Sequence, residues 1–204
     1  MRLKMSKIKI CGLRTPEDIS YVNQVSPDYA GFIFVPGRTR YITPQTAREL
    51  RRQLHPHILS VGVFLDAPIE EVLTLARQEL FTVIQLHGNE PDSYIKALKK
   101  SCPFPVIKAF SIRAAKDVDT ALASKADYLL FDNGKGGTGQ SFDWSLLGQI
   151  ERPFFLAGGM NPCNVADAIT RLHPYAVDVS SGVESDGHKD LQKMQAFVQA
   201  VRKS

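Results

Sequence analysis

The stretch KIKICGLRTPEDISYVNQVSPDYAGFIFV, residues 7–35, contains the repeating unit of this 204-residue chain. A short apolar run (7–13) is followed by a segment with helical spacing and then by a second apolar, β-branched run (29–35). Thr15 is a typical helix N-cap, Pro16 suits the first helical position, and acidic residues follow it in the first turn. The pattern predicts a strand, a helix and a second strand parallel to the first.

Similar apolar runs recur along the rest of the chain. Each is mostly apolar at its centre, as expected of strands that are buried on both faces in a parallel sheet. The six further runs span 59–66, 82–88, 105–111, 128–134, 153–159 and 176–182. Helical patterns separate the runs, and Pro44, Pro68 and Pro162 mark three further helix starts. The shortest helix candidate follows Phe142, and the last helix is expected from Lys189 onward.

Eight strands alternating with eight helices predict an α/β fold, a single-domain (β/α)8 barrel over residues 1–204. A doubly wound open sheet is the structural alternative. It seldom needs eight equal units, and no G-x-G-x-x-G motif follows the first strand.

The composition, 44% hydrophobic and 23% charged with a formal net charge of +4, is that of a globular protein. Without a run of about 18 apolar residues or a signal-peptide core, we expect no membrane association. Three cysteines without a CxxC pair predict no disulfide framework and a reducing compartment, the cytoplasm. The basic cluster at Arg48, Arg51 and Arg52 has helical spacing, which favours a solvated helix face over nucleic-acid binding. The polar helix faces favour a monomer.

Glycine-rich loops follow the last three predicted strands, at 134–139, 157–162 and 178–184. Glycine lets backbone N–H groups approach a ligand closely, and barrels of this type often bind phosphate after strands seven and eight. The residues expected to bind phosphate are Gly158, Gly159, Ser180, Ser181 and Gly182. Tight turns alone are the alternative interpretation. The chain contains no G-x-x-x-x-G-K-[ST] motif, so we expect no nucleotide-binding P-loop.

Active residues of such barrels lie where strands end. Cys11 ends the first predicted strand and Asp132 the sixth. A proton abstraction coupled to a proton donation needs one basic and one acidic group. Cys11 would need an electropositive setting to serve as a thiolate, and Asp132 would need burial to keep its proton. A packed thiol and a turn-forming aspartate remain equally acceptable interpretations at this point.

Other polar residues admit several interpretations. The pair His55 and His57 lies ahead of a strand with no nearby acid, so we expect no metal site there. An arginine of the second loop, Arg38 or Arg40, could clamp a planar carboxylate or could be a solvated cation. Residue chemistry alone does not choose between the two arginines.

Taken together, the motifs resemble one known family. They are KICGL, GFIFVPGRTRYI, VGVFLD, VIQLHGNE, VIKAF, FDN followed by GGTGQSFDW, LAGGMNPCNV, and AVDVSSGVE followed by GHKD. In this order and spacing, over almost the entire chain, they resemble the phosphoribosylanthranilate isomerase family of tryptophan biosynthesis. The resemblance implies a (β/α)8 barrel and an Amadori rearrangement without metal or organic cofactor. The implied substrate is a small phosphosugar, N-(5-phosphoribosyl)anthranilate, and the product is 1-(2-carboxyphenylamino)-1-deoxyribulose 5-phosphate.

The resemblance also implies roles for individual residues. Cys11 matches the general base, Asp132 the general acid, and Arg40 rather than Arg38 the contact to the anthranilate carboxylate. It further implies that three residues line the sugar, namely Gln85, His87 and Asp178. The loop residues Gly137, Thr138 and Gly139 would lie near the phosphate.

This sequence departs from the family at Arg14, where threonine is more usual, which leaves the polarity of the first loop open. One alternative is the sibling isomerase of histidine biosynthesis, which carries an aspartate where Cys11 stands. The other is a catalytically idle barrel that binds a phosphosugar and acts as a regulator; the intact Cys11, Asp132 and Arg40 argue against it.

Overall fold

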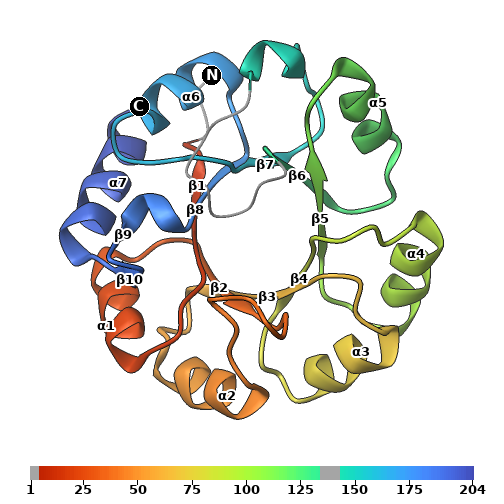
Figure 1. Ribbon diagram of the computed structural model, residues 1–204, viewed down its shortest axis with the longest axis vertical. Helices are drawn as coiled ribbons and strands as arrows, with labels where there is room; N and C mark the ends of the chain where they lie inside the picture. Colours follow the sequence, from red (N-terminus) through yellow and green to blue (C-terminus); the bar gives the residue numbers. More distant parts are fainter. Residues whose placement is uncertain (1–4, 134–142) are drawn as a thin grey trace.

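The computed structural model describes residues 5–133 and 143–204. Eight parallel strands form a closed barrel in chain order, with β8 paired to β1 (Figure 1). They are β1 (Lys7–Cys11), β2 (Tyr29–Ile33), β3 (Leu59–Phe64), β4 (Val83–Leu86), β5 (Val106–Ser111), β6 (Tyr128–Asp132), β7 (Phe154–Leu156) and β8 (Ala176–Val179). The predicted barrel is confirmed, and closure of the sheet excludes the open, doubly wound alternative.

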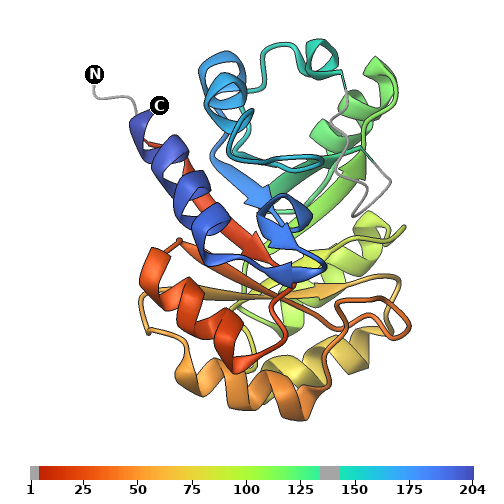
Figure 2. The same ribbon diagram turned by 60° about the vertical axis from the view of Figure 1, so that its left-hand side comes forward.

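Helices surround the barrel on the outside (Figure 1). They are α1 (Pro16–Val25), α2 (Pro44–Gln53), α3 (Ile69–Arg77), α4 (Asp92–Ser101), α5 (Ala115–Ala123), α6 (Val165–Leu172) and α7 (Leu191–Lys203). The start of α1 is as predicted, because Thr15 accepts from the Asp18 backbone N–H and Asp18 caps in return. The last helix, α7, packs beside α1 and α6, so the first and last helices of the ring are neighbours (Figure 2).

Two expectations about helices are wrong. The connection after β6 contains, in its described part, only a short 3-10 helix, η1 (Trp144–Leu147). It ends after four residues because Gly148 turns the backbone to φ 55°. Pro162 does not open α6. Asn161 and Asn164 form a side-chain-capped turn first, so the helix begins only at Val165.

The core has two layers, set by the alternation of side chains along each strand. In β1, Ile8 and Ile10 face the helices, and Cys11 belongs to the cluster inside the barrel. Toward the N-terminal ends of the strands the interior is aromatic; the Tyr29 and Tyr175 hydroxyls lie 3.0 Å apart there. Polar interior residues lie toward the other end, where the strands stop.

A small hairpin follows β8. The chain passes through the 3-10 helix η2 (Ser181–Val183) into β9 (Glu184–Ser185) and β10 (His188–Lys189), which pair antiparallel. The Lys189 ammonium reaches back to donate to the Ser180 carbonyl at 3.0 Å. The hairpin therefore adds charged residues to the rim beside the end of β1. Within the described ranges, no helix has the length and apolar character needed to cross a membrane.

Candidate active site

Cys11 and Asp132 both lie at the C-terminal ends of their strands and are 7% and 6% exposed. Room for the Cys11 side chain depends on its register partner, Gly31 on β2. A Cβ atom at Gly31 would lie 2.6 Å from the Cys11 sulfur. Glycine is therefore required at this position if the thiol is to keep its orientation.

A buried lysine lies beside the thiol. Lys9 precedes Cys11 by two residues on β1 and is 0% exposed; its ammonium donates to both Asp178 oxygens at 2.9 and 3.0 Å. Burial works to lower the pKa of Lys9, but Asp178 and Cys11 outweigh it, so the pKa is raised. Burial raises the pKa of the Cys11 thiol, and Lys9 and Lys189 partly offset that rise. The sequence predicted Asp178 as a site residue but not its partner Lys9. The K-x-C spacing places Lys9 and Cys11 on the same face of a strand, and this could have revealed Lys9.

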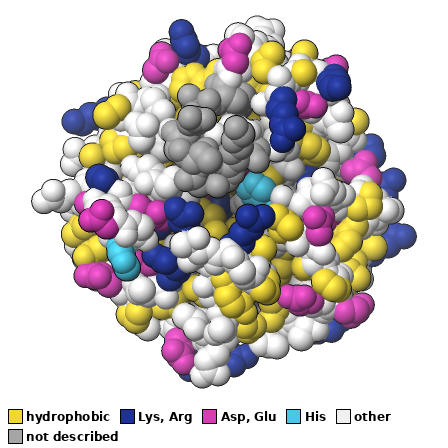
Figure 3. Space-filling model, in the orientation of Figure 1, with side chains coloured by type: hydrophobic (Ala, Val, Ile, Leu, Met, Phe, Trp, Pro, Cys, Tyr) yellow, Lys and Arg dark blue, Asp and Glu magenta, His cyan; other side chains and the backbone are white. Residues whose placement is uncertain are grey.

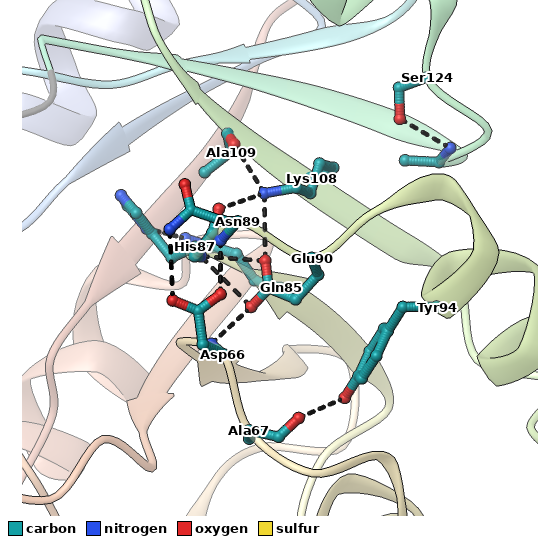
Figure 4. Close-up of polar contacts among 12 residues, drawn as sticks. Asp66, Ala67, Gln85, His87, Asn89, Glu90, Tyr94, Lys108, Ala109 and Ser124 are labelled. Carbon is teal, nitrogen blue, oxygen red and sulfur yellow. Dashed lines mark hydrogen bonds and ion pairs between the residues drawn. The ribbon is translucent and has the colours of Figure 1, made fainter.

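Asp132 faces a histidine. His87 Nε2 lies 3.3 Å from Asp132 Oδ2. On its other side, the Gln85 amide nitrogen lies 3.1 Å from His87 Nδ1 (Figure 4). The Gln85 amide donates, so His87 Nδ1 accepts and the ring proton sits on Nε2, toward Asp132; this assignment follows from the network. Gln85 is 1% exposed and its Oε1 has no hydrogen-bond partner among the described residues.

Arg40 is held by a carboxylate. Its Nε and Nη2 donate to the two Glu184 oxygens at 2.8 and 2.6 Å, and Lys189 donates to Glu184 Oε1 at 2.7 Å. Burial works to raise the pKa of Glu184, but Arg40 and Lys189 overcome it and lower the pKa to about 2. Arg38 is exposed. Neither Glu184 nor Lys189 was expected from the sequence, because the hairpin that carries them showed no strand pattern.

The loops after β7 and β8 lie side by side. Gly158 and Gly159 have positive φ angles of 80° and 70°. Gly182, in η2, lies against the Met160 carbonyl of the loop after β7. The Ser180 hydroxyl donates to the Cys11 carbonyl at 3.0 Å, which joins this region to the end of β1. Ser181 opens η2. The predicted residues Gly137, Thr138 and Gly139 lie outside the described residues.

Arg14 ties three loops together. Its guanidinium donates to the Thr39 carbonyl at 3.2 Å and to the Gly187 carbonyl of the hairpin. The first loop is thus bonded to the loop that carries Arg40 and to the hairpin that carries Glu184. Lys and Arg side chains gather around the central hollow of the face that Figure 3 shows. Within the described ranges, no group of three or more His, Cys, Asp or Glu residues could hold a metal ion.

The closed parallel barrel, with a thiol and a carboxyl group at the ends of two strands, defines a (β/α)8-barrel protein equipped for acid–base chemistry. A family model described as N-(5'-phosphoribosyl)anthranilate (PRA) isomerase matches residues 8–200. The chain belongs to this family, whose members are isomerases.

Individual relatives agree along their full lengths. The N-(5'-phosphoribosyl)anthranilate isomerase of Endomicrobium trichonymphae is 46% identical, covering 97% of this chain and 99% of that protein. A phosphoribosyl anthranilate isomerase in complex with reduced 1-(o-carboxyphenylamino)-1-deoxyribulose 5-phosphate is 33% identical, with a TM-score of 0.85 over 98% of this chain and 100% of the other. A structure of monomers of the dimeric enzyme from Thermotoga maritima is 34% identical, with a TM-score of 0.87 and the same coverage.

Proposed function

We propose that this protein isomerises N-(5-phosphoribosyl)anthranilate to 1-(2-carboxyphenylamino)-1-deoxyribulose 5-phosphate in tryptophan biosynthesis, with Asp132 as general acid and Cys11 as general base. The observation that carries the proposal is the pair of buried acid–base groups at the ends of β1 and β6, in a chain that belongs to this isomerase family. The reaction opens one ring bond and relocates hydrogen atoms, so substrate and product have the same composition.

In the first step, Asp132 gives its proton to the furanose ring oxygen. The bond from that oxygen to C1′ breaks, and the lone pair of the anthranilate nitrogen forms the C1′ iminium. Asp132 ends β6 and is 6% exposed, so bulk water has little access to its carboxyl group. When Asp132 has given up its proton, the Nε2–H of His87, 3.3 Å away, can donate to the carboxylate that remains.

In the second step, the Cys11 thiolate removes the proton from C2′. The electrons of the C–H bond form a C1′–C2′ double bond, and the iminium becomes an enolamine. The enolamine then tautomerises: C1′ gains a proton, the C2′ hydroxyl loses one, and the ketone forms. The iminium makes the C2′ proton acidic, which explains why protonation of the ring oxygen comes first.

The groups that bind the substrate are assigned to the rim of the barrel. The anthranilate carboxylate contacts Arg40, which keeps the donors of Nη1 free of the Glu184 bonds. The sugar lies along Gln85, His87 and Asp178. The phosphate binds between the loops after β7 and β8, at Gly158, Gly159, Ser180, Ser181 and Gly182.

The test is turnover of the substrate. Purified protein mixed with phosphoribosylanthranilate, without added metal, is expected to abolish the fluorescence of the anthranilate conjugate. An unchanged fluorescence under single-turnover conditions would reject the enzyme assignment and favour an idle phosphosugar-binding barrel. Faster turnover of the aldose-amine of histidine biosynthesis than of phosphoribosylanthranilate would favour the sibling isomerase.

We also propose that the barrel acts as a monomeric single domain in the cytoplasm. Among the described residues, the large apolar side chains that are exposed are few: Met5, Leu59 and Leu65. The dimeric Thermotoga maritima relative is the counter-example. Sedimentation equilibrium is expected to give the chain mass of 22.7 kDa, and twice that mass would show a dimer. The three cysteines are free thiols, which suits a reducing compartment.

A further inference from the structure

The end of β1 is surrounded by more positive than negative charge. Within the described part of the chain, three cations lie around it. Lys9 shares with Cys11 the inner face of β1. Lys189 donates to the carbonyl of Ser180, whose hydroxyl donates to the Cys11 carbonyl, and Arg40 packs against Gly12. Each of the three acts electrostatically on the thiol. Two carboxylates pair with them, Asp178 with Lys9 and Glu184 with the other two. Counting formal charges, three positive and two negative groups leave a surplus of one positive charge beside the thiol.

The two lysines are buried in the protein rather than free in solvent. The Lys9 and Lys189 side chains are 0% and 1% exposed. A buried ammonium group is stable only when anions and carbonyl oxygens surround it. Lys9 has the two Asp178 oxygens, and Lys189 has one Glu184 oxygen and the Ser180 carbonyl. Because solvent is excluded, the attraction of these groups for a nearby negative charge is weakly screened.

Two other ionisable groups lie near this cluster. Asp132 on β6 and His87 at the end of β4 also act on Asp178. They contact each other, with His87 Nε2 3.3 Å from Asp132 Oδ2, so they form a pair of their own beside the cluster.

We propose that Lys9 and Lys189 are positioning residues for the reaction: their buried ammonium groups stabilise the thiolate of Cys11, which supplies the third negative charge of the cluster. The inference rests on the proposed role of Cys11 as base. It adds what the bare assignment lacks, a source of the positive charge that a buried thiol needs in order to ionise. Arg40 contributes to the same field, but its guanidinium also serves the substrate carboxylate.

The thiol can be titrated without substrate. We would replace Cys102 and Cys163 by alanine and serine, so that the ultraviolet absorbance of the thiolate reports Cys11 alone, and then follow it against pH. Lys189→Met is the sharpest variant, because Glu184 keeps Arg40 as a partner. We expect the titration midpoint to rise by about one unit, which is about tenfold less thiolate at neutral pH. A midpoint within ~0.3 units of the parent would overturn the inference.

A second variant removes a negative charge instead of a positive one, and so distinguishes an effect of charge from an effect of altered structure. Glu184→Gln removes a negative charge from the same place, so the midpoint is expected to fall. Midpoints that move in the same direction in both variants would contradict a charge effect. Lys108→Met is the matched control. Lys108 is also a buried lysine paired with a carboxylate, Glu90 at 3.1 Å, but it lies on β5 in a separate polar group (Figure 4). It should leave the Cys11 midpoint unchanged.

The titration and the turnover assay separate two kinds of failure. If the parent protein fails to convert phosphoribosylanthranilate, the proposed function is wrong, whatever the thiol does. If it converts the substrate but Lys189→Met leaves the midpoint in place, only the inference about the lysines is wrong. If both hold, kcat of Lys189→Met should approach the parent value as the pH is raised, since alkali restores the thiolate.

Discussion

His87 Nε2 lies 3.3 Å from Asp132 Oδ2, and these two residues come from strand ends that are 45 positions apart in the chain. The histidine is itself oriented by Gln85 beneath it on the same strand. The acid of the proposed mechanism therefore has a hydrogen-bond donor that is held in place by a buried amide. The following predictions test this arrangement and its surroundings.

Cys11→Ser and Asp132→Asn should each lower kcat by at least about 100-fold, because each removes one proton-transfer group. The fold should survive, since both changes are close to isosteric. Steady-state kinetics, with circular dichroism to check folding, measure the effect. Rates near that of the parent in either variant would show that the assigned role is wrong.

Gln85→Leu should lower kcat by less than the ~100-fold expected for loss of an acid or base, because His87 loses only its orienting partner. Stability should change little, since the change also removes the buried Oε1 atom, which has no hydrogen-bond partner in the described ranges. Thermal unfolding and kcat are measured together. Gln45→Leu, on the exposed side of α2, is the control. A stability loss without a kcat loss would assign Gln85 to packing alone.

Glu184 should make stability depend on pH. Its pKa is lowered from 4.5 to about 2, so its contribution is complete above pH 4.5 and is lost as the pH falls through about 2. The contribution is at most roughly 3 kcal/mol in the free energy of unfolding. Urea unfolding across this range should show Glu184→Gln less stable than the parent at neutral pH, with the difference shrinking in acid. A constant difference would mean that the ion pairs contribute nothing.

Cys11 should control the rise of the rate with pH. Burial raises the pKa of its thiol, so the thiolate fraction and kcat/KM should increase as the pH is raised through neutrality into the alkaline range. The pH profile of kcat/KM measures this. A flat profile would indicate that proton abstraction by Cys11 does not limit the reaction.

Gly31→Ala should cost about 1–3 kcal/mol of stability, because the new methyl group meets the Cys11 sulfur. The same change in a Cys11→Ala background should cost less, since the sulfur is gone. Equal costs in the two backgrounds, measured by urea unfolding, would show that the thiol does not occupy this space.

The order of strands and helices could be predicted from the sequence because burial imposes a local pattern. A strand covered on both faces must be apolar along its length, and the Thr-Pro start of α1 satisfies the helix end with neighbouring residues. Cys11 and Asp132 could be proposed for a related reason: in a parallel barrel, all strand ends meet on one face. The helix expected after β6 was wrong because Gly148 turns the backbone and ends the 3-10 helix after four residues.

What only the tertiary structure decided is which charges meet. Lys9 and Asp178 are 169 positions apart and pair because β8 closes the barrel onto β1. Lys189 reaches the same site from a hairpin with no strand pattern, and Glu184 takes two donors of Arg40. Electrostatic energy depends on separation in space and on the exclusion of water, and neither can be deduced from the local order of residues. The sequence by itself determined the barrel and its candidate base; the fold determined the charges that act on that base.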